Sequence, residues 1–162
     1  LTFVLDFGKG SVAVLLAKTF IPALVIDTET QKIFLSLAGV IVVCGHVFSV
    51  FLRFKGGKGI STLFGVLAVL NLNIGICAAI VWLVMFFWRH ISSLSGITML
   101  TVLPWLFLLI PWLKNESPVW PVFFLFLLLS SLLVYQHLEN IKRLLRGKEG
   151  QLSASKNNDV HN

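Results

Sequence analysis

Six apolar stretches separated by short polar segments constrain this chain more than any other feature of its sequence. Several approach the roughly 20 residues that a helix needs to cross a bilayer, and helices are expected because an open strand cannot pair its backbone groups in lipid. Only 12% of the residues are charged, against about 25% in soluble domains. We therefore predict an all-α, polytopic transmembrane helical bundle with about six spans. The stretches are approximately Phe3–Ile26, Ile33–Phe51, Ile60–Leu70, Ile74–Trp88, Ile97–Leu113 and Val119–Tyr135.

Basic residues are distributed unevenly among the polar segments. If the chain starts on the cytoplasmic side, the segments on that side hold ten of the thirteen Lys and Arg residues, and the opposite segments hold only Lys32 and Lys114. An excess of Lys and Arg marks cytoplasmic loops. Fusing the stretches that begin at Ile60 and Ile74 would destroy this asymmetry, so we keep them separate and predict a cytoplasmic C-terminus. The ten residues are Lys9, Arg53, Lys55, Lys58, Arg89, Lys142, Arg143, Arg146, Lys148 and Lys156.

The domain organisation is simple. We predict one transmembrane domain over residues 1–150 and a polar, disordered cytoplasmic tail over residues 151–162. Cys44 and Cys77 lie in apolar stretches without CxxC spacing or clustered histidines, so neither a disulfide framework nor a zinc site is indicated. We expect no metal, no other cofactor and no nucleic-acid partner. Because the chain starts at Leu1 without a methionine, we expect the natural N-terminus to lie upstream.

The segment before Ile60 combines glycines with basic residues: Arg53-Phe54-Lys55-Gly56-Gly57-Lys58-Gly59. Glycines allow positive φ and close approach to a ligand, and successive N–H groups in such turns bind anions. A helix beginning near Ile60 would add its positive dipole end. We predict that Gly56, Gly57, Lys58 and Gly59 hold a phosphate, although the spacing is not that of a Walker loop. The alternative is a turn whose cations only anchor the helices.

Two further polar segments lie on the same predicted side. His137 and Asn140 share a helical face and could hold one ligand group, or their segment could be an interfacial basic helix attracted to anionic lipid. The hydroxyls around Ser92 could bind a phosphate oxygen or simply cap the next helix, which we favour. Asp6 and Lys9, three residues apart near the start of the first stretch, are expected to form an internal ion pair.

Taken together, two of these motifs resemble those of the PlsY family of bacterial acyl-phosphate:glycerol-3-phosphate acyltransferases. They are Gly45-His46…Phe54-Lys55-Gly56-Gly57-Lys58-Gly59 and His137-x-Glu139-Asn140-Ile141-x-Arg143-Leu144-Leu145-x-Gly147-x-Glu149. The family has seven spans and an additional Ser-Gly-Asn motif that this sequence lacks, so the resemblance implies a truncated chain that is weakly active or inactive. Ser49 and His90 stand where the family usually has Pro and Tyr.

The resemblance implies transfer of an acyl group from acyl phosphate to the 1-hydroxyl of glycerol 3-phosphate, giving lysophosphatidate in a bacterial cytoplasmic (inner) membrane, with the active face cytoplasmic. Lys58, His137 and Asn140 are the implied catalytic residues. Ser92 and Arg143 join the glycine-rich loop in binding phosphate, and membrane lipids are further partners. His137 is expected to bind substrate and not to be an obligatory base. The alternatives are a transporter for an anionic metabolite and a lipid-binding subunit.

Overall fold

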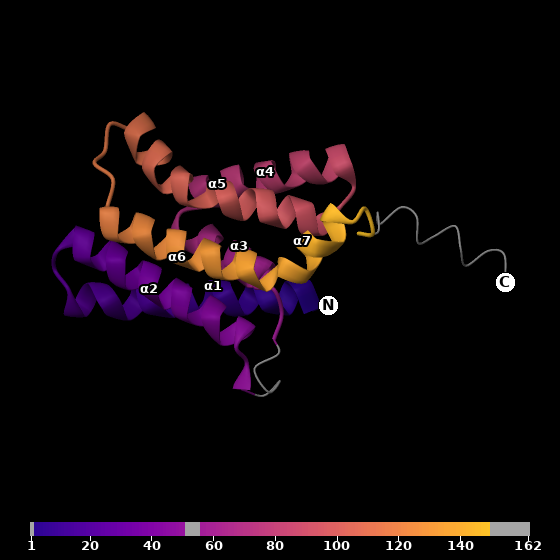
Figure 1. The fold of residues 1–162 in the computed structure, drawn as a ribbon. Helices are drawn as coiled ribbons and strands as arrows, with labels where there is room; N and C mark the ends of the chain where they lie inside the picture. The colour runs from indigo at the N-terminus through magenta and orange to yellow at the C-terminus, as the bar shows by residue number, and fades with distance from the viewer. Residues whose placement is uncertain (1, 51–55, 150–162) are drawn as a thin grey trace.

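The computed structural model describes residues 2–50 and 56–149. The predicted tail over residues 151–162, together with Arg53 and Lys55, lies outside the described residues. The described part forms seven helices, with short connections between them (Figure 1). They are α1 (Thr2–Leu24), α2 (Thr28–Val47), α3 (Ile60–Leu70), α4 (Leu72–Arg89), α5 (Ser92–Leu113), α6 (Trp120–Gln136) and α7 (Leu138–Leu145).

Each of the six predicted apolar stretches contains a helix, and the two whose separation was least obvious are separate. Asn71 adopts an extended conformation between α3 and α4, and its side chain accepts a hydrogen bond from the Ile74 amide at 3.3 Å. Asp27 caps α2 in the same way, accepting from the Thr30 amide at 2.7 Å. Such side chains pair N–H groups that the first helical turn leaves without a partner.

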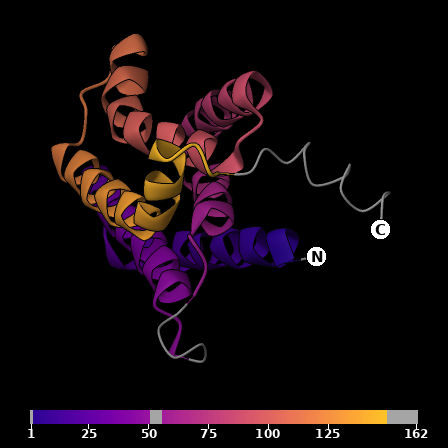
Figure 2. The same ribbon diagram turned by 45° about the vertical axis from the view of Figure 1, so that its right-hand side comes forward.

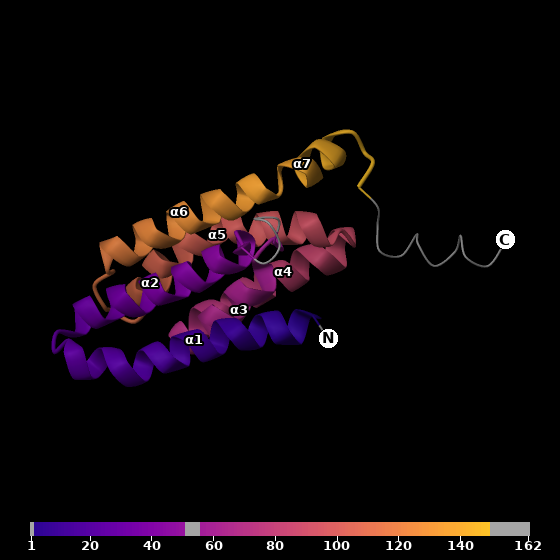
Figure 3. The same cartoon turned by 90° about the horizontal axis from the view of Figure 1, so that it is seen from below.

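Successive helices α1 to α6 run in alternating directions (Figures 1 and 3). The start of α1, the connection into α3, the turn from α4 to α5 and the junction of α6 with α7 all lie toward one end of the bundle, as a view turned by 45° also shows (Figure 2). The segments that the charge asymmetry assigned to one side of the bilayer are therefore grouped in space. We call this the basic end.

The helices differ in their capacity to cross a bilayer. Within the described ranges, α2, α4 and α5 each combine the length and hydropathy of a complete span, and α6 with α7 passes the same test as a pair bent by 58°. The 11 residues of α3 extend about 16 Å at 1.5 Å per residue, roughly half of the hydrocarbon thickness. Helix α3 therefore reaches only part-way across, and six complete spans remain a prediction.

The centre of the bundle is apolar, and so is much of its surface. Val43, Leu63, Leu100 and Phe126, from four different helices, are fully buried. Large apolar side chains also point outward, among them Leu128, which is 69% exposed. An exposed apolar belt of this kind suits lipid as the surrounding solvent.

Helices α1 and α3 approach each other closely because glycines face the opposing backbone. A methyl group at Gly10 would overlap the carbonyl oxygen of Thr62, and one at Gly65 would overlap that of Phe7. The Ser11 hydroxyl donates a hydrogen bond to the Gly65 carbonyl at 3.0 Å. This packing fixes the start of α1 beside the segment that leads into α3, which positions the site described next.

Candidate active site

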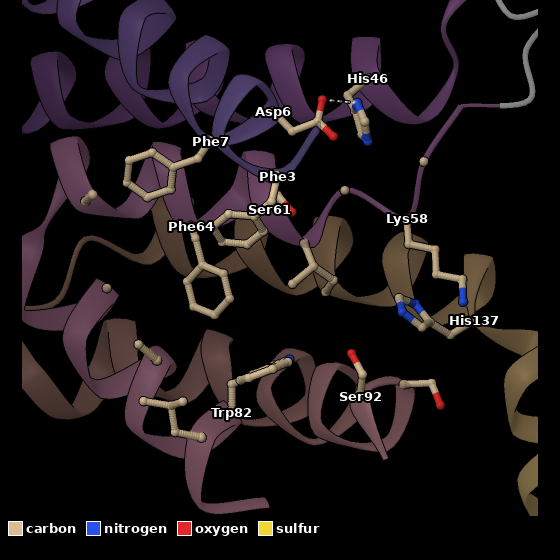
Figure 4. A pocket seen from close by; sticks show the side chains of 18 of the residues that line it. Phe3, Asp6, Phe7, His46, Lys58, Ser61, Phe64, Trp82, Ser92 and His137 are labelled. Atoms are coloured by element: carbon tan, nitrogen blue, oxygen red, sulfur yellow. Dashed lines mark ion pairs between the residues drawn. The ribbon is translucent and has the colours of Figure 1, made fainter. Parts of the chain in front are cut away.

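A cavity of about 790 Å³ opens at the basic end and extends between α1, α3 and α4. Its polar lining comes from five separate parts of the chain (Figure 4). Its remaining walls are largely apolar. The polar side chains are Asp6, His46, Lys58, Ser61, Ser92, Ser93 and His137, and the apolar ones include Phe3, Phe7, Phe64, Ile76, Trp82 and Leu83. The cavity thus has the chemical profile of an amphiphile, with a charged end and a long apolar body.

The glycine-rich loop is fastened to the end of α2. The Gly56 amide donates to the Val47 carbonyl at 3.1 Å. Gly59 has φ 81° and ψ −6° and is the residue from which α3 starts. This left-handed conformation is the one that favours glycine, so the predicted need for positive φ is confirmed at Gly59.

The other two loop glycines are explained differently from the prediction. A methyl group at Gly56 would overlap the His46 carbonyl oxygen, and one at Gly57 would overlap the His46 ring. Their small size lets the loop lie against α2. Glycine at these two positions is therefore explained by packing against α2, and not only by access for a ligand.

Lys58 extends from this loop toward the His137 ring (Figure 4). Burial lowers the pKa of the Lys58 ammonium, an effect that the carboxylate of Glu149 opposes and the Arg143 guanidinium reinforces. Lys58 and His137 both line this cavity at the basic end, and the sequence predicted that they would lie close together. A cation so placed, next to the N-terminus of α3, favours an anionic ligand.

His137 is held in one tautomer. The residue is 2% exposed, and its Nδ1 lies 2.7 Å from the Leu133 carbonyl oxygen. A carbonyl only accepts hydrogen bonds, so Nδ1 carries the proton and Nε2 keeps its lone pair. Burial is the main cause that lowers the His137 pKa, and the charge of Lys58 also contributes, against the raising effect of the Leu133 hydrogen bond. A neutral imidazole with an acceptor nitrogen is therefore favoured.

Glu149 organises the remaining polar groups. Its Oε1 accepts hydrogen bonds from the Ser93 hydroxyl and the Asn140 amide, both at 2.6 Å. Its Oε2 lies 3.0 Å from Arg143 Nε. The bonds from Ser93 and Asn140 are the leading causes of the lowered Glu149 pKa. Asn140 and Arg143, which the sequence assigned to the substrate, are thus paired with this carboxylate.

The serine segment shows one wrong prediction and one residue that was missed. Ile91 is the N-cap residue of α5, and no side chain among the described residues caps this helix end. Ser92 cannot cap it because Ser92 is already the first helical residue; capping was therefore the wrong interpretation. Ser92 and the unpredicted Ser93 both line the cavity instead.

Three charged or polar side chains join α1 to α2 at the edge of the cavity. Lys9 Nζ lies 2.7 Å from Asp6 Oδ1, which confirms the predicted internal ion pair. The same ammonium contacts Nδ1 of His46. Asp6 Oδ1 is 3.6 Å from that nitrogen (Figure 4).

Comparison with known proteins identifies the family of this chain. A family model described as glycerol-3-phosphate acyltransferase matches residues 1–147. The chain belongs to this acyltransferase family. A glycerol-3-phosphate acyltransferase from Ehrlichia chaffeensis is 35% identical over 153 residues, which are 94% of this chain and 71% of the relative. One from Aquifex aeolicus is 37% identical over 149 residues, or 92% of this chain and 71% of the relative.

Solved acyltransferase structures share the fold. The crystal structure of PlsY, an integral membrane glycerol 3-phosphate acyltransferase, in its glycerol 3-phosphate form matches with a TM-score of 0.73 and 33% identity, over 93% of this chain and 68% of that one. Its lysophosphatidic acid form matches with a TM-score of 0.72 at the same identity. The prediction of an all-helical acyltransferase fold in the membrane is confirmed.

In this acyltransferase the predicted site residues fall into two groups. Gly57, Lys58, Gly59, Ser92 and His137 line one cavity. Asn140 and Arg143 form the second group, and both contact Glu149. Gly56 belongs to neither group, since its amide binds the end of α2. The individual roles of these residues remain predictions.

Proposed function

We propose that this chain transfers an acyl group from acyl phosphate to the 1-hydroxyl of glycerol 3-phosphate, releasing lysophosphatidate and inorganic phosphate. The observation that carries the proposal is the cavity that joins Lys58 and His137 to a long apolar wall. Such a cavity suits a reaction in which two phosphate-bearing molecules meet and one of them carries an acyl chain. Residues 1–150 would act as a single domain for this purpose.

The chemistry requires positioning and charge stabilisation more than it requires a strong base. The hydroxyl oxygen forms a bond to the acyl carbonyl carbon, and the bond from that carbon to the phosphate oxygen breaks. The hydroxyl proton ends on the released phosphate. Negative charge that develops on the carbonyl and phosphate oxygens would be stabilised by Lys58 and by N–H groups of the Gly57–Gly59 segment.

His137 would orient the glycerol 3-phosphate. Its Nε2 lone pair can accept a hydrogen bond from a hydroxyl group, since Nδ1 already donates to Leu133. Ser92 lies across the cavity and would bind a phosphate oxygen (Figure 4). Asn140 and Arg143 would contribute through the Glu149 cluster that borders this end of the cavity.

We further propose that the basic end faces the cytoplasm of a bacterial cell, in the cytoplasmic (inner) membrane. The distribution of Lys and Arg supports this orientation. Acyl chains would lie along the apolar walls of α1, α3 and α4, so that product can leave into the surrounding lipid. The proposed reaction includes no metal and no other cofactor.

The experiment that tests the function compares Lys58→Ala with Lys142→Ala. Lys142 is a matched control because it is a lysine at the same end, with its side chain 58% exposed and paired with Glu139 at 2.7 Å. Phosphate release from acyl phosphate, dependent on glycerol 3-phosphate, is measured with the purified protein in detergent. We expect Lys58→Ala to lower kcat/KM by about a hundredfold, in the range for loss of a charge-stabilising donor, and Lys142→Ala to change it less than about threefold.

The two other classes of function predict different results. A lipid-binding subunit would lose no turnover at Lys58, and a transporter would carry glycerol 3-phosphate across vesicles without forming lysophosphatidate. A Lys58→Ala variant that keeps the wild-type rate would overturn the proposed role of the loop.

A further inference from the structure

His46 lies between the Asp6–Lys9 ion pair of α1 and Gly57 of the glycine-rich loop. It comes from the last turn of α2, and its side chain is only 14% exposed. On one side, Nδ1 contacts the Lys9 ammonium of α1. On the other, Nε2 and Cε1 are the atoms that a methyl group on Gly57 would meet first. The ring therefore fills the space between an ion pair and the glycine-rich loop.

The contact with Lys9 fixes the ring chemically as well as sterically. An ammonium group can only donate hydrogen bonds, so Nδ1 of His46 must accept and the ring proton must reside on Nε2. Lys9 is itself held by Asp6 Oδ1 at 2.7 Å. The N–H of His46 that faces the loop thus has a set direction, and the next residue after Gly57 is Lys58.

Gly56 and Gly57 meet different parts of the same residue. At Gly56 the obstacle to a side chain is backbone, namely the carbonyl oxygens of His46 and Val47. At Gly57 the three nearest atoms in the described part of the chain all belong to the imidazole ring. Shortening the His46 side chain would therefore open space at Gly57 but none at Gly56, which provides a test internal to the loop.

We propose that His46 is a positioning residue for the phosphate-binding loop: Lys9 and Asp6 hold its ring, and the ring sets how closely Gly57 approaches α2 and hence where Lys58 stands. This inference rests on the proposed function and adds to it that Lys58, which extends toward His137, also holds the phosphate of the glycerol 3-phosphate that His137 orients. It assigns to the Asp6–Lys9 pair at the start of α1 a task beyond pairing charges within a helix.

The test is a double-variant cycle with two readouts on the purified chain in detergent. The first readout is the Kd for glycerol 3-phosphate, and the second is the midpoint of thermal unfolding without ligand. The variants are Gly57→Ala, Gly56→Ala and His46→Ala, with each glycine variant also combined with His46→Ala. Lys9→Met removes the donor that fixes the ring, and Lys32→Met, at the other end of the bundle, is its control.

We expect Gly57→Ala to weaken glycerol 3-phosphate binding at least about tenfold when His46 is present, and by less than about threefold when His46 is alanine, a coupling typical of residues in contact. Gly56→Ala should weaken binding by the same factor in both backgrounds. Lys9→Met should weaken binding by several-fold with little change in the unfolding midpoint, and Lys32→Met should leave both unchanged.

Two results would overturn the inference. In the first, the unaltered chain binds glycerol 3-phosphate, but Gly57→Ala weakens binding by the same factor whether residue 46 is histidine or alanine. The ring would then not limit the position of the loop. The other is coupling seen in the unfolding midpoint alone, which would make His46 a packing residue only. Failure of the proposed function is distinguishable from either, since the unaltered chain would then not bind glycerol 3-phosphate at all.

Discussion

Replacing Glu149 by glutamine should loosen the cluster that holds α7 against the start of α5. The Glu149 side chain is 13% exposed and receives hydrogen bonds from Ser93 and Asn140, with Arg143 at 3.0 Å. Glutamine has nearly the same shape but carries no charge. It also presents an amide NH₂ group to neighbours that are themselves donors. The substitution therefore removes an acceptor without making a cavity.

The magnitude follows from the three contacts. Hydrogen bonds to a charged group contribute about 1.5–3 kcal/mol, whereas an exposed ion pair contributes about 0–1 kcal/mol. The Arg143 side chain is 55% exposed, so most of the effect should come from Ser93 and Asn140. Because glutamine retains one acceptor oxygen, we expect a net loss of about 2–3 kcal/mol, which corresponds to a fall of about 4–12 °C in the midpoint of unfolding for a chain of this size.

The pH dependence provides a second, independent signature. The folded-state pKa of Glu149 is lowered from its ordinary value of 4.5. Its contribution to stability is therefore fully present above that ordinary value and is lost as the pH falls through the lowered one. The difference between wild type and Glu149→Gln should be complete at neutral pH and should shrink as the pH is taken below about 4.5.

The assay is thermal unfolding in detergent, followed by circular dichroism, for wild type, Glu149→Gln and Glu139→Gln. Glu139 is the control because, among the residues that the structure describes, its one ion pair is with exposed Lys142 on the same helix, and its variant should shift the midpoint by less than about 2 °C. Equal midpoints for wild type and Glu149→Gln at neutral pH would refute the reasoning, as would a difference that persists unchanged in acid.

Three further predictions concern glycines. Gly59→Ala must take a left-handed conformation at φ 81° beside Leu133, so it should destabilise the protein by about 1–2 kcal/mol or more, measured as a lower midpoint of unfolding. Gly8→Ala in α1, where a methyl group meets open space within the described part of the chain, should be neutral or slightly stabilising. Gly65→Ala would press a methyl group on the Phe7 carbonyl and should cost about 1–3 kcal/mol; an unchanged midpoint would mean that α1 and α3 are not packed as described.

The positions of the helices could be predicted because apolar length and Lys/Arg bias act locally along the chain. Ile60 was expected to begin a helix, and α3 begins there. The clustering of Lys58 with His137 was also predictable, since alternating spans return both segments to one end of the bundle.

The partners of individual side chains could not be read from the sequence. Asn140 is nine residues from Glu149, and only the turn after α7 brings the carboxylate back to it. The obstacles to side chains at Gly56 and Gly57 are atoms of His46 and Val47, and local spacing does not reveal a contact between separate segments. The hydroxyls around Ser92 were expected to cap a helix drawn from about Ile97, but α5 already starts at Ser92, after the extended backbone at Ile91.

The lengthwise arrangement of the cavity has a consequence for how a membrane would grow. Its charged groups sit at one end and its apolar walls run along the helices away from that end. A molecule formed there already has the orientation of a lipid in one leaflet, with its phosphate at the water boundary. It would enter that leaflet by lateral diffusion without turning over, so the two halves of the bilayer could expand together only if another process moved lipids between them.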